Sequence, residues 1–247
     1  MTRPLDAFAS EPLGEIGIYD QPPINVYDLA RRLGVTEIRT APLVEDGRLE
    51  VSHNQVRIRL RSGLSPARRR FTIAHELAHL LIENRPEMAK RVRVPTTGIE
   101  RRCDEMAAAI LLPYSWVMDN YSHSTASMAT VRDLADAAHV SMGAAVVRLK
   151  EVLGWHYSLL RWRRDTERWR FVAGAGVPKP FFGKIQSAPT TTATLEALLS
   201  QQGRDHVTVL PVSVRSAVRL LRAEVSLRGN TSIALTDLLQ SDRVVAR

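Results

Sequence analysis

The sequence predicts an α+β protein made of two parts, and three patterns support this expectation. Apolar residues recur with helical spacing over residues 67–83, which follow short strand-like segments, and again over Glu100–Leu112. From Trp155 onward, apolar and basic residues alternate as they do in half-buried strands. A chain of 247 residues can bury a sizeable core and has the length of two domains.

The distribution of charge supports the same division. Residues 1–154 carry 20 Lys and Arg against 19 Asp and Glu, whereas residues 155–247 carry 14 against 7. We expect an N-terminal extension over residues 1–22, a first domain over residues 23–154 and a basic α+β domain over residues 155–247. The basic domain favours an anionic partner, although a solvated surface would satisfy the same count.

The first domain is expected to begin with a short helix and a small sheet. Pro23–Gly34 has apolar residues at helical spacing and ends at a glycine. Asp46-Gly47 predicts a turn. Strand-like segments occur at Glu37–Thr40, around Val51 and at Val56–Leu60.

A long helix should follow this sheet. Ser65 is a good N-cap, Pro66 suits the first helical position, and Asn84 with Pro86 marks the end. The second half of the helix is apolar on almost every side, which is typical of a buried helix. Two histidines and a glutamate within it need compensation, because burying unpaired imidazoles and a carboxylate costs free energy.

A metal ion would supply that compensation at His75-Glu76-Leu77-Ala78-His79. On a helix the two histidines lie one above the other, so both can reach one zinc ion, while Glu76 projects beside them as a general base. This arrangement predicts a zincin-like metallopeptidase domain. The alternative is a chance match, with both histidines in the core and bonded to backbone carbonyls.

A third ligand is expected on the helix at Glu100–Leu112, which Pro113 stops. Glu100 and Asp104 fall within its apolar arc, whereas Glu105 lies outside it, between two arginines that can pair with it. We predict Glu100 as the third zinc ligand, with Glu105 as the alternative. Asp104 is predicted to accept the remaining N–H of a ligating histidine. An acidic helix N-terminus favoured by the helix dipole is the structural alternative, and it suits Glu100 better than Asp104.

Cysteine content and hydropathy indicate where the protein resides. The single cysteine, Cys103, excludes an internal disulfide, and its place on the apolar arc favours packing over nucleophilic chemistry. The chain has no apolar run of about eighteen residues, and its first residues lack a hydrophobic signal core. We expect a cytoplasmic protein without membrane contact.

Two short helices are expected over Thr130–Leu153, separated near residues 139–141, with Ser141 as N-cap and Gly154 as terminator. We predict that this helical pair closes the first domain. The alternative is a helix-turn-helix that reads DNA, but the second helix offers few basic residues for that role.

The C-terminal domain is expected to combine strands and helices. A hairpin should pair Tyr157–Arg163 with Arg168–Ala173 about a turn at residues 165–167. The alternation favours a half-buried hairpin with solvated arginines over a surface on which Trp162 and Trp169 stack with nucleic acid. Further expected elements are a helix at Thr192–Gln202, strands near Val207–Val214 and Val218–Leu227, and a final helix near Ala234–Gln240.

Three segments together resemble the ImmA/IrrE family of metallo-endopeptidases, namely Pro23–Gly34, Arg70–His79 and Glu100–Pro113. The resemblance covers residues 23–154 and is far more specific than the pentapeptide alone. It implies a zinc-dependent intracellular protease that cleaves a helix-turn-helix transcriptional repressor and so relieves repression of mobile-element or stress-response genes. It also implies a sensor-like C-terminal α+β domain. Ala78, Cys103 and Met106 depart from residues common in the family, but they lie away from the expected ligands.

The expected mechanism assigns one task to each site residue. Neutral His75 and His79 with ionised Glu100 would hold zinc. Glu76 would take a proton from water and pass it to the leaving amine. The alternative function is a zinc-stabilised regulator without proteolysis that binds a repressor or DNA through its basic C-terminal half.

Two parts of the substrate site are less well defined by the sequence. An extended substrate should pair with an edge strand near the metal, for which Val56–Leu60 is the candidate; an ordinary scaffold strand is the alternative. A donor for the oxyanion is also expected, but nothing selects among Tyr114, Tyr121 and His123.

Overall fold

A computed structural model describes residues 4–15, 17, 21–52, 55–84, 98–164, 169–181, 185, 206–214, 217–228, 231–238 and 243–245. Contacts within the chain divide it into two compact units. Unit 1 comprises Met1–Ser122 and Ala135–Ser141, and unit 2 comprises His123–Leu134 and Met142–Arg247. Helices and sheets are mixed along the chain, which confirms the predicted α+β class.

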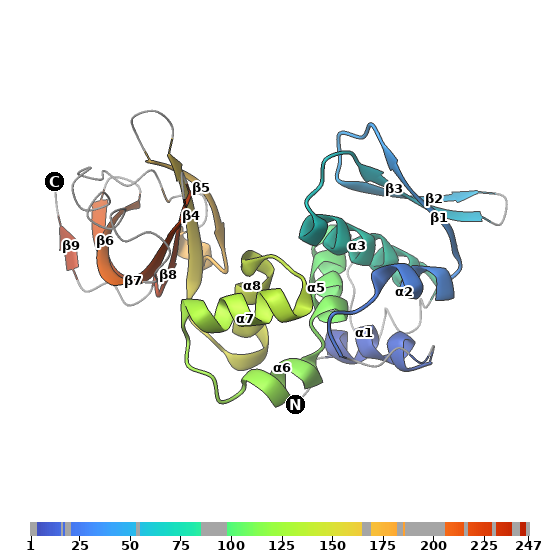
Figure 1. Ribbon diagram of the computed structural model, residues 1–247, viewed down its shortest axis with the longest axis horizontal. Helices are drawn as coiled ribbons and strands as arrows, with labels where there is room; N and C mark the ends of the chain where they lie inside the picture. The colour runs from blue at the N-terminus through green and yellow to red at the C-terminus, as the bar shows by residue number, and fades with distance from the viewer. Residues whose placement is uncertain are drawn as a thin grey trace. The chain divides into compact units, whose positions relative to one another are not determined.

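Unit 1 combines a small sheet with helices (Figure 1). In chain order, its described elements are α1 (Pro4–Glu15), α2 (Val26–Arg32), β1 (Val35–Ala41), β2 (Gly47–Ser52), β3 (Gln55–Arg61), α3 (Pro66–Asn84), α5 (Ile99–Leu111) and α6 (Tyr114–Tyr121). Helix α3 contacts β2 and β3 as well as α5, so it has a sheet on one side and a helix on another. This placement buries Ile73, Ala74 and Leu77 completely and explains why the helix is apolar on almost every side.

The helix ends follow from local capping. Ser65 accepts a hydrogen bond from the Arg68 N–H through its Oγ at 3.3 Å, which confirms it as the N-cap of α3. Asn25 caps α2 by accepting the N–H groups of Tyr27 and Asp28, so this helix begins later than the predicted Pro23. Helix α1 lies in the segment expected to be an extension; it contacts α5 and buries Phe8.

The sheet of unit 1 has the order β1-β3-β2, with β3 parallel to β1 and antiparallel to β2. The prediction that Val56–Leu60 is an edge strand is therefore wrong, because this segment belongs to β3 and pairs on both sides. Strand β2 is an edge strand of this sheet, and it contacts α3. Asp46-Gly47 leads directly into β2, with Gly47 as its first residue.

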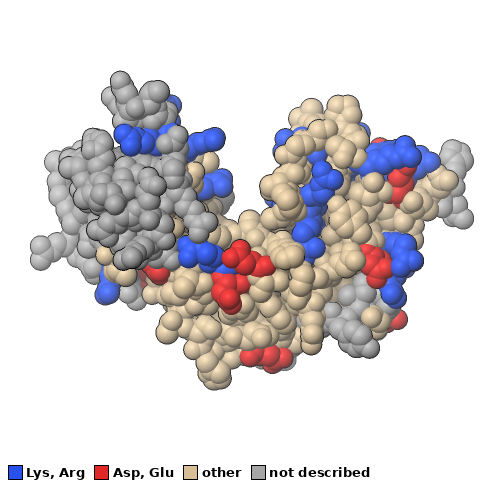
Figure 2. Space-filling view, in the orientation of Figure 1, with Lys and Arg blue, Asp and Glu red and all other residues tan. Residues whose placement is uncertain are grey.

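Charges on the sheet are paired. Figure 2 shows Lys and Arg gathered over the region of this sheet. Arg59 of β3 lies 3.1 Å from Glu37 of β1 and 3.2 Å from Glu50 of β2. Arg39 also pairs with Glu37, and Arg48 with Glu45. Arg57 lies 3.8 Å from Glu37 as well, so three arginines share this one carboxylate.

Unit 2 contains an antiparallel sheet. Helix α7 (Met128–Ala138) begins in this unit, and its other described elements are α8 (Met142–Leu153), β4 (Ser158–Arg164), β5 (Trp169–Ala175), a 3-10 turn (Lys179–Phe181), β6 (His206–Val214), β7 (Ala217–Arg228), β8 (Thr231–Thr236) and β9 (Arg243–Val245). The strand order is β5-β4-β8-β7-β6, and β9 pairs with β7. Helix α8 contacts β4 and β5. Side chains from β4, β7 and β8 form a shared core that includes Trp162.

The expected hairpin of β4 and β5 is present, and Arg161 and Arg163 are exposed on either side of buried Trp162. The predicted final helix near Ala234–Gln240 is wrong in its described part. Residues 231–236 form β8, which pairs with β4 on one side and β7 on the other, so hydrogen bonding between strands outweighs local helical preference. The turn at residues 165–167 and the helix predicted at Thr192–Gln202 lie outside the described residues.

Helices α7 and α8 occupy the segment in which two short helices were predicted, with Gly154 in the left-handed conformation at the end of α8. Their role in closing the first domain, and the domain boundary at residue 154, stay predictions. No helix in the described ranges combines the length and the apolar character needed to cross a membrane.

Candidate metal centre

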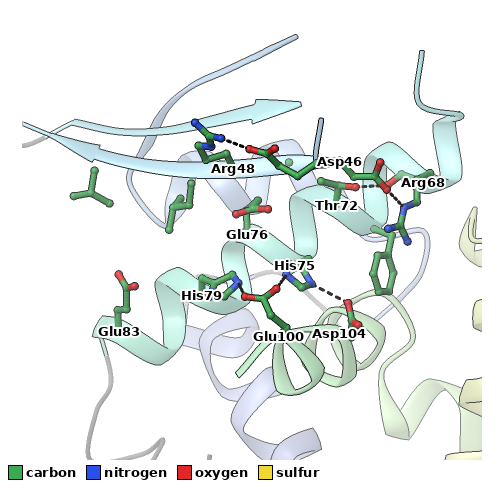
Figure 3. Close-up of a pocket in the computed structure, with 15 residues that line it drawn as sticks. Asp46, Arg48, Arg68, Thr72, His75, Glu76, His79, Glu83, Glu100 and Asp104 are labelled. Carbon is green, nitrogen blue, oxygen red and sulfur yellow. Dashed lines mark hydrogen bonds and ion pairs between the residues drawn. The ribbon is translucent and has the colours of Figure 1, made fainter. Parts of the chain in front are cut away.

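Two histidines and a glutamate converge at the junction of α3 and α5 (Figure 3). His75 and His79 lie one turn apart on α3, and Glu100 reaches towards both from the first turn of α5. Glu100 Oε2 lies 3.1 Å from His75 Nε2, and Glu100 Oε1 lies 3.4 Å from His79 Nε2. One possible ligand atom from each residue lies within 4.8 Å of the others. The described part of the chain holds no second group of this kind.

The donor set fits a zinc ion. Tetrahedral zinc with bonds of about 2.0–2.2 Å to nitrogen and oxygen holds neighbouring ligand atoms about 3.3–3.6 Å apart. The two distances of 3.1 and 3.4 Å from Glu100 to the imidazoles are close to that separation. Two imidazoles and one carboxylate form a ligand set typical of catalytic zinc, which keeps a fourth position open. The identity of the metal and the roles of the three residues stay predictions.

Asp104 lies one turn further along α5 and contacts the first histidine. Its Oδ1 is 2.9 Å from His75 Nδ1, so the ring N–H at Nδ1 can donate to this carboxylate. That hydrogen bond would select the tautomer in which His75 Nε2 carries the free lone pair on the side of Glu100. The structure thus brings Asp104 to the position expected from the sequence.

Glu105 does not reach the histidines. It pairs with Arg101 at 3.0 Å and with Arg102 at 2.6 Å on the far side of α5. Its side chain is only 15% exposed, whereas Glu100 is 72% exposed. The sequence therefore predicted which side of the helix each carboxylate occupies, but not its exposure. The first turn of α5 borders an open pocket, while the later residues of the same arc, such as Met106, enter the core.

A pocket of about 750 Å³ opens over these residues. Strand β2 and the two residues before it line one side, and α3 with the first turn of α5 lines the other. Neither Tyr114 nor Tyr121 is among its lining residues; Tyr121 is buried and packs edge-on against Trp116. The structure therefore gives no support to these tyrosines as oxyanion donors.

Glu76 lies in the pocket between β2 and the two histidines (Figure 3). The residue is only 6% exposed. Burial raises the pKa of Glu76, although the charge of His75 and the main-chain N–H of Leu49 oppose this shift. A raised pKa brings a carboxylate closer to the range in which a general base works at neutral pH.

Cys103 takes no part in this site. It is fully buried on α5, and burial raises the pKa of its thiol to about 12, so the side chain remains a protonated thiol within the core.

Strand β2 contributes to the pocket in a way that the sequence alone does not predict. Gly47, Leu49 and Val51 of this strand line the pocket, whereas Asp46-Gly47 by itself predicts only a turn. The signal available was the glycine itself, since glycine at a strand position often marks a close approach of another element.

Metal-free protein should become less stable as the pH rises through the titration of His75. Burial lowers the pKa of His75, but the hydrogen bond and charge of Asp104, together with Glu76 and Glu100, raise it overall above 6.5. Protonated His75 therefore stabilises the folded state below about pH 6.5, and this contribution is lost as the pH rises through the higher folded pKa. Zinc requires neutral imidazole, so the rise in melting temperature on adding zinc should be larger at about pH 8 than at about pH 6.

Thermal melts of chelator-treated and zinc-loaded protein across this range measure both trends. Asp104→Asn removes the largest contribution that raises the His75 pKa, so the stabilisation on the acid side should shrink in this variant. A chelated protein whose melting temperature rises over the same range would contradict the assignment.

The fold and site define a class of protein. A helix with two histidines and an intervening glutamate, beside a second helix with a carboxylate that meets both imidazoles, is the arrangement of metallopeptidases. Residues 24–150 match the family described as the IrrE N-terminal-like domain, Peptidase_M78. This match covers more than half of the chain, which therefore belongs to the ImmA/IrrE family of metallopeptidases.

Two curated relatives share part of this region. The chain is 30% identical over 112 residues to the radiation response metalloprotease IrrE of Deinococcus radiodurans, covering 43% of this chain and 34% of that protein. The IrrE of Deinococcus deserti is also 30% identical over 112 residues, covering 43% of this chain and 39% of that protein. The matched region thus spans little more than a third of these relatives.

A solved structure shows the same fold. A Mycobacterium tuberculosis transcriptional regulator matches with a TM-score of 0.56 and 16% identity, covering 94% of this chain and 76% of that chain. At this identity the likeness concerns the fold alone.

Proposed function

We propose that this protein is a cytoplasmic zinc-dependent endopeptidase that cleaves a helix-turn-helix transcriptional repressor. The observation that carries the proposal is the convergence of His75, His79 and Glu100 with Glu76 beside them in one pocket. A structural zinc site normally uses four protein ligands, whereas three with an open fourth position favour catalysis. Relief of repression at mobile-element or stress-response genes is the proposed consequence of cleavage.

The chain's own residues would divide the work as follows. Zinc bound by the three ligands would acidify a water molecule and polarise the scissile carbonyl. Glu76 would accept the proton of the attacking water and return it to the leaving amine. Asp104 would keep His75 in the tautomer and orientation that binding requires.

Strand β2 is the proposed substrate-binding strand in place of β3. It lies at the edge of its sheet, and Gly47, Leu49 and Val51 line the pocket beside the candidate metal ligands. Val51 is 61% exposed there. An extended segment of the substrate could pair with main-chain groups of this edge and so place its scissile bond over the site.

Incubation with a candidate repressor tests the proposal. We expect the helix-turn-helix repressor encoded nearest to the gene to be cut into two defined fragments, visible by mass spectrometry. A zinc chelator should stop the reaction, and added zinc should restore it. Repressor that leaves its DNA without any fragment, with or without chelator, would instead identify a regulator that acts by binding alone.

A further inference from the structure

Gly47 occupies a position with no room for a side chain. A Cβ added to this residue would lie far inside van der Waals contact with Thr72 Cγ2 and 2.9 Å from Glu76 Oε1. Gly47 is not among the residues with positive φ, so its backbone conformation does not call for glycine. The requirement is for space between β2 and α3.

Thr72 cannot easily move its methyl group out of the way. Its hydroxyl donates a hydrogen bond of 2.9 Å to the Arg68 carbonyl within α3, which fixes the rotamer. Thr72 is also buried, with 4% of its surface exposed. The methyl group therefore sets the distance at which β2 packs on α3, one turn before Glu76.

The same close approach confines the Glu76 carboxylate. Glu76 is only 6% exposed, and its Oε1 lies 2.9 Å from the place that a Cβ on Gly47 would take. Gly47 and Leu49 lie opposite Leu60 and Ile58 in the pairing of β2 with β3, so the strand beside the carboxylate is a rigid element that restricts where the carboxylate can lie.

The start of β2 is held against both of its neighbours. The Asp46 carboxylate pairs with Arg61 of β3 and with Arg68 of α3. The Asp46 carbonyl also accepts the Arg61 N–H at 2.9 Å. Figure 3 shows Asp46 beside Arg68, and these contacts hold the start of β2 close to α3.

We propose that β2 is a positioning element for Glu76: Gly47 permits the close approach, and the paired strand confines the carboxylate in the orientation needed to accept a proton. This inference rests on the proposed role of Glu76 as general base. Gly47 is thus a positioning residue that acts through Glu76.

Gly47→Ala tests the steric part with zinc-loaded full-length protein and the repressor as substrate. We expect kcat to fall by about 10- to 100-fold, because an error of about 1 Å in placement is enough for a loss of this size. Single-turnover rates at saturating repressor separate this effect from weaker substrate binding to β2, and zinc content should change much less. Gly14→Ala is the matched control, since a Cβ at Gly14 in α1 meets nothing within 4 Å and kcat should stay unchanged.

A second substitution separates positioning from packing. In Gly47→Ala/Thr72→Ser the clashing methyl of Thr72 is gone and the hydroxyl bond to Arg68 is retained, so the melting temperature should recover towards that of the wild-type protein. The alanine methyl still meets the Glu76 carboxylate, so the loss in kcat should persist. Full recovery of kcat in the double variant would overturn the proposal, because packing alone would then explain the effect.

The position of the carboxylate can be measured without any substrate. In crystal structures of the variants, the Glu76 carboxylate should be displaced in Gly47→Ala and should keep its wild-type position in Gly14→Ala. A Glu76 carboxylate that keeps its wild-type position in Gly47→Ala would overturn the proposal. If the wild-type protein leaves the repressor intact, the proposed function fails, whereas this measurement still decides whether β2 confines the carboxylate.

Discussion

Replacing Glu76 by glutamine should abolish cleavage of the repressor while zinc remains bound. Glutamine keeps the size of the side chain, but its amide cannot take a proton from water. Loss of a positioned general base costs about 10²- to 10⁴-fold in rate, so cleavage should fall close to background. Single-turnover cleavage rates and metal content measured on the same preparation test both halves of this expectation.

A remote carboxylate supplies the control for this substitution. Glu11 is exposed on α1, and Glu11→Gln removes the same charge without touching the pocket. Its cleavage rate should equal that of the wild type. A Glu76→Gln protein that cuts at the wild-type rate would exclude Glu76 as the base, and a repressor released intact by both variants would favour the binding regulator.

The side of the helix on which each site residue lies was predictable from the sequence, because the spacing of residues around a helix is a local property. Ser65 and Pro66 located the start of α3, and spacing alone placed His75 and His79 on one side of it. The phase of the following helix placed Glu100 on the side that meets both imidazoles. These inferences needed no knowledge of the rest of the fold.

Strand order could not be read in the same way. The alternation of Val56–Leu60 indicates a strand, but nothing in that segment shows that β1 and β2 cover both of its edges. Residues 231–236 show the same limit, since their strand conformation depends on pairing with β4 and β7. The contact of Gly47 with Thr72 and Glu76 likewise depends on how two elements pack, which a single sequence does not encode locally.

Removing the Glu100 carboxylate should abolish stable zinc binding. In Glu100→Ala, only the two imidazoles of α3 remain, and both are then without the group that meets them at 3.1 and 3.4 Å. Losing a hydrogen-bond partner of a ligand typically costs about 10- to 100-fold in metal affinity, so losing a direct ligand should cost at least that much. Competition against a chromophoric chelator measures the affinity, and the stabilisation that zinc gives in thermal melts should shrink in parallel.

Glu105→Ala provides the internal comparison because it lies on the same helix and loses the same charge. Glu105 pairs with Arg101 and Arg102 and not with the histidines, so its removal should leave zinc affinity unchanged. Asp104→Asn should fall between the two, with a loss of about 10- to 100-fold, because it disturbs the orientation of His75 and leaves the ligand itself in place. The opposite order, with zinc lost in Glu105→Ala and kept in Glu100→Ala, would transfer the role of third ligand to Glu105 and require α5 to turn its other side to the histidines. From the observed distances we expect the loss of zinc affinity to be largest in Glu100→Ala, smaller in Asp104→Asn and absent in Glu105→Ala.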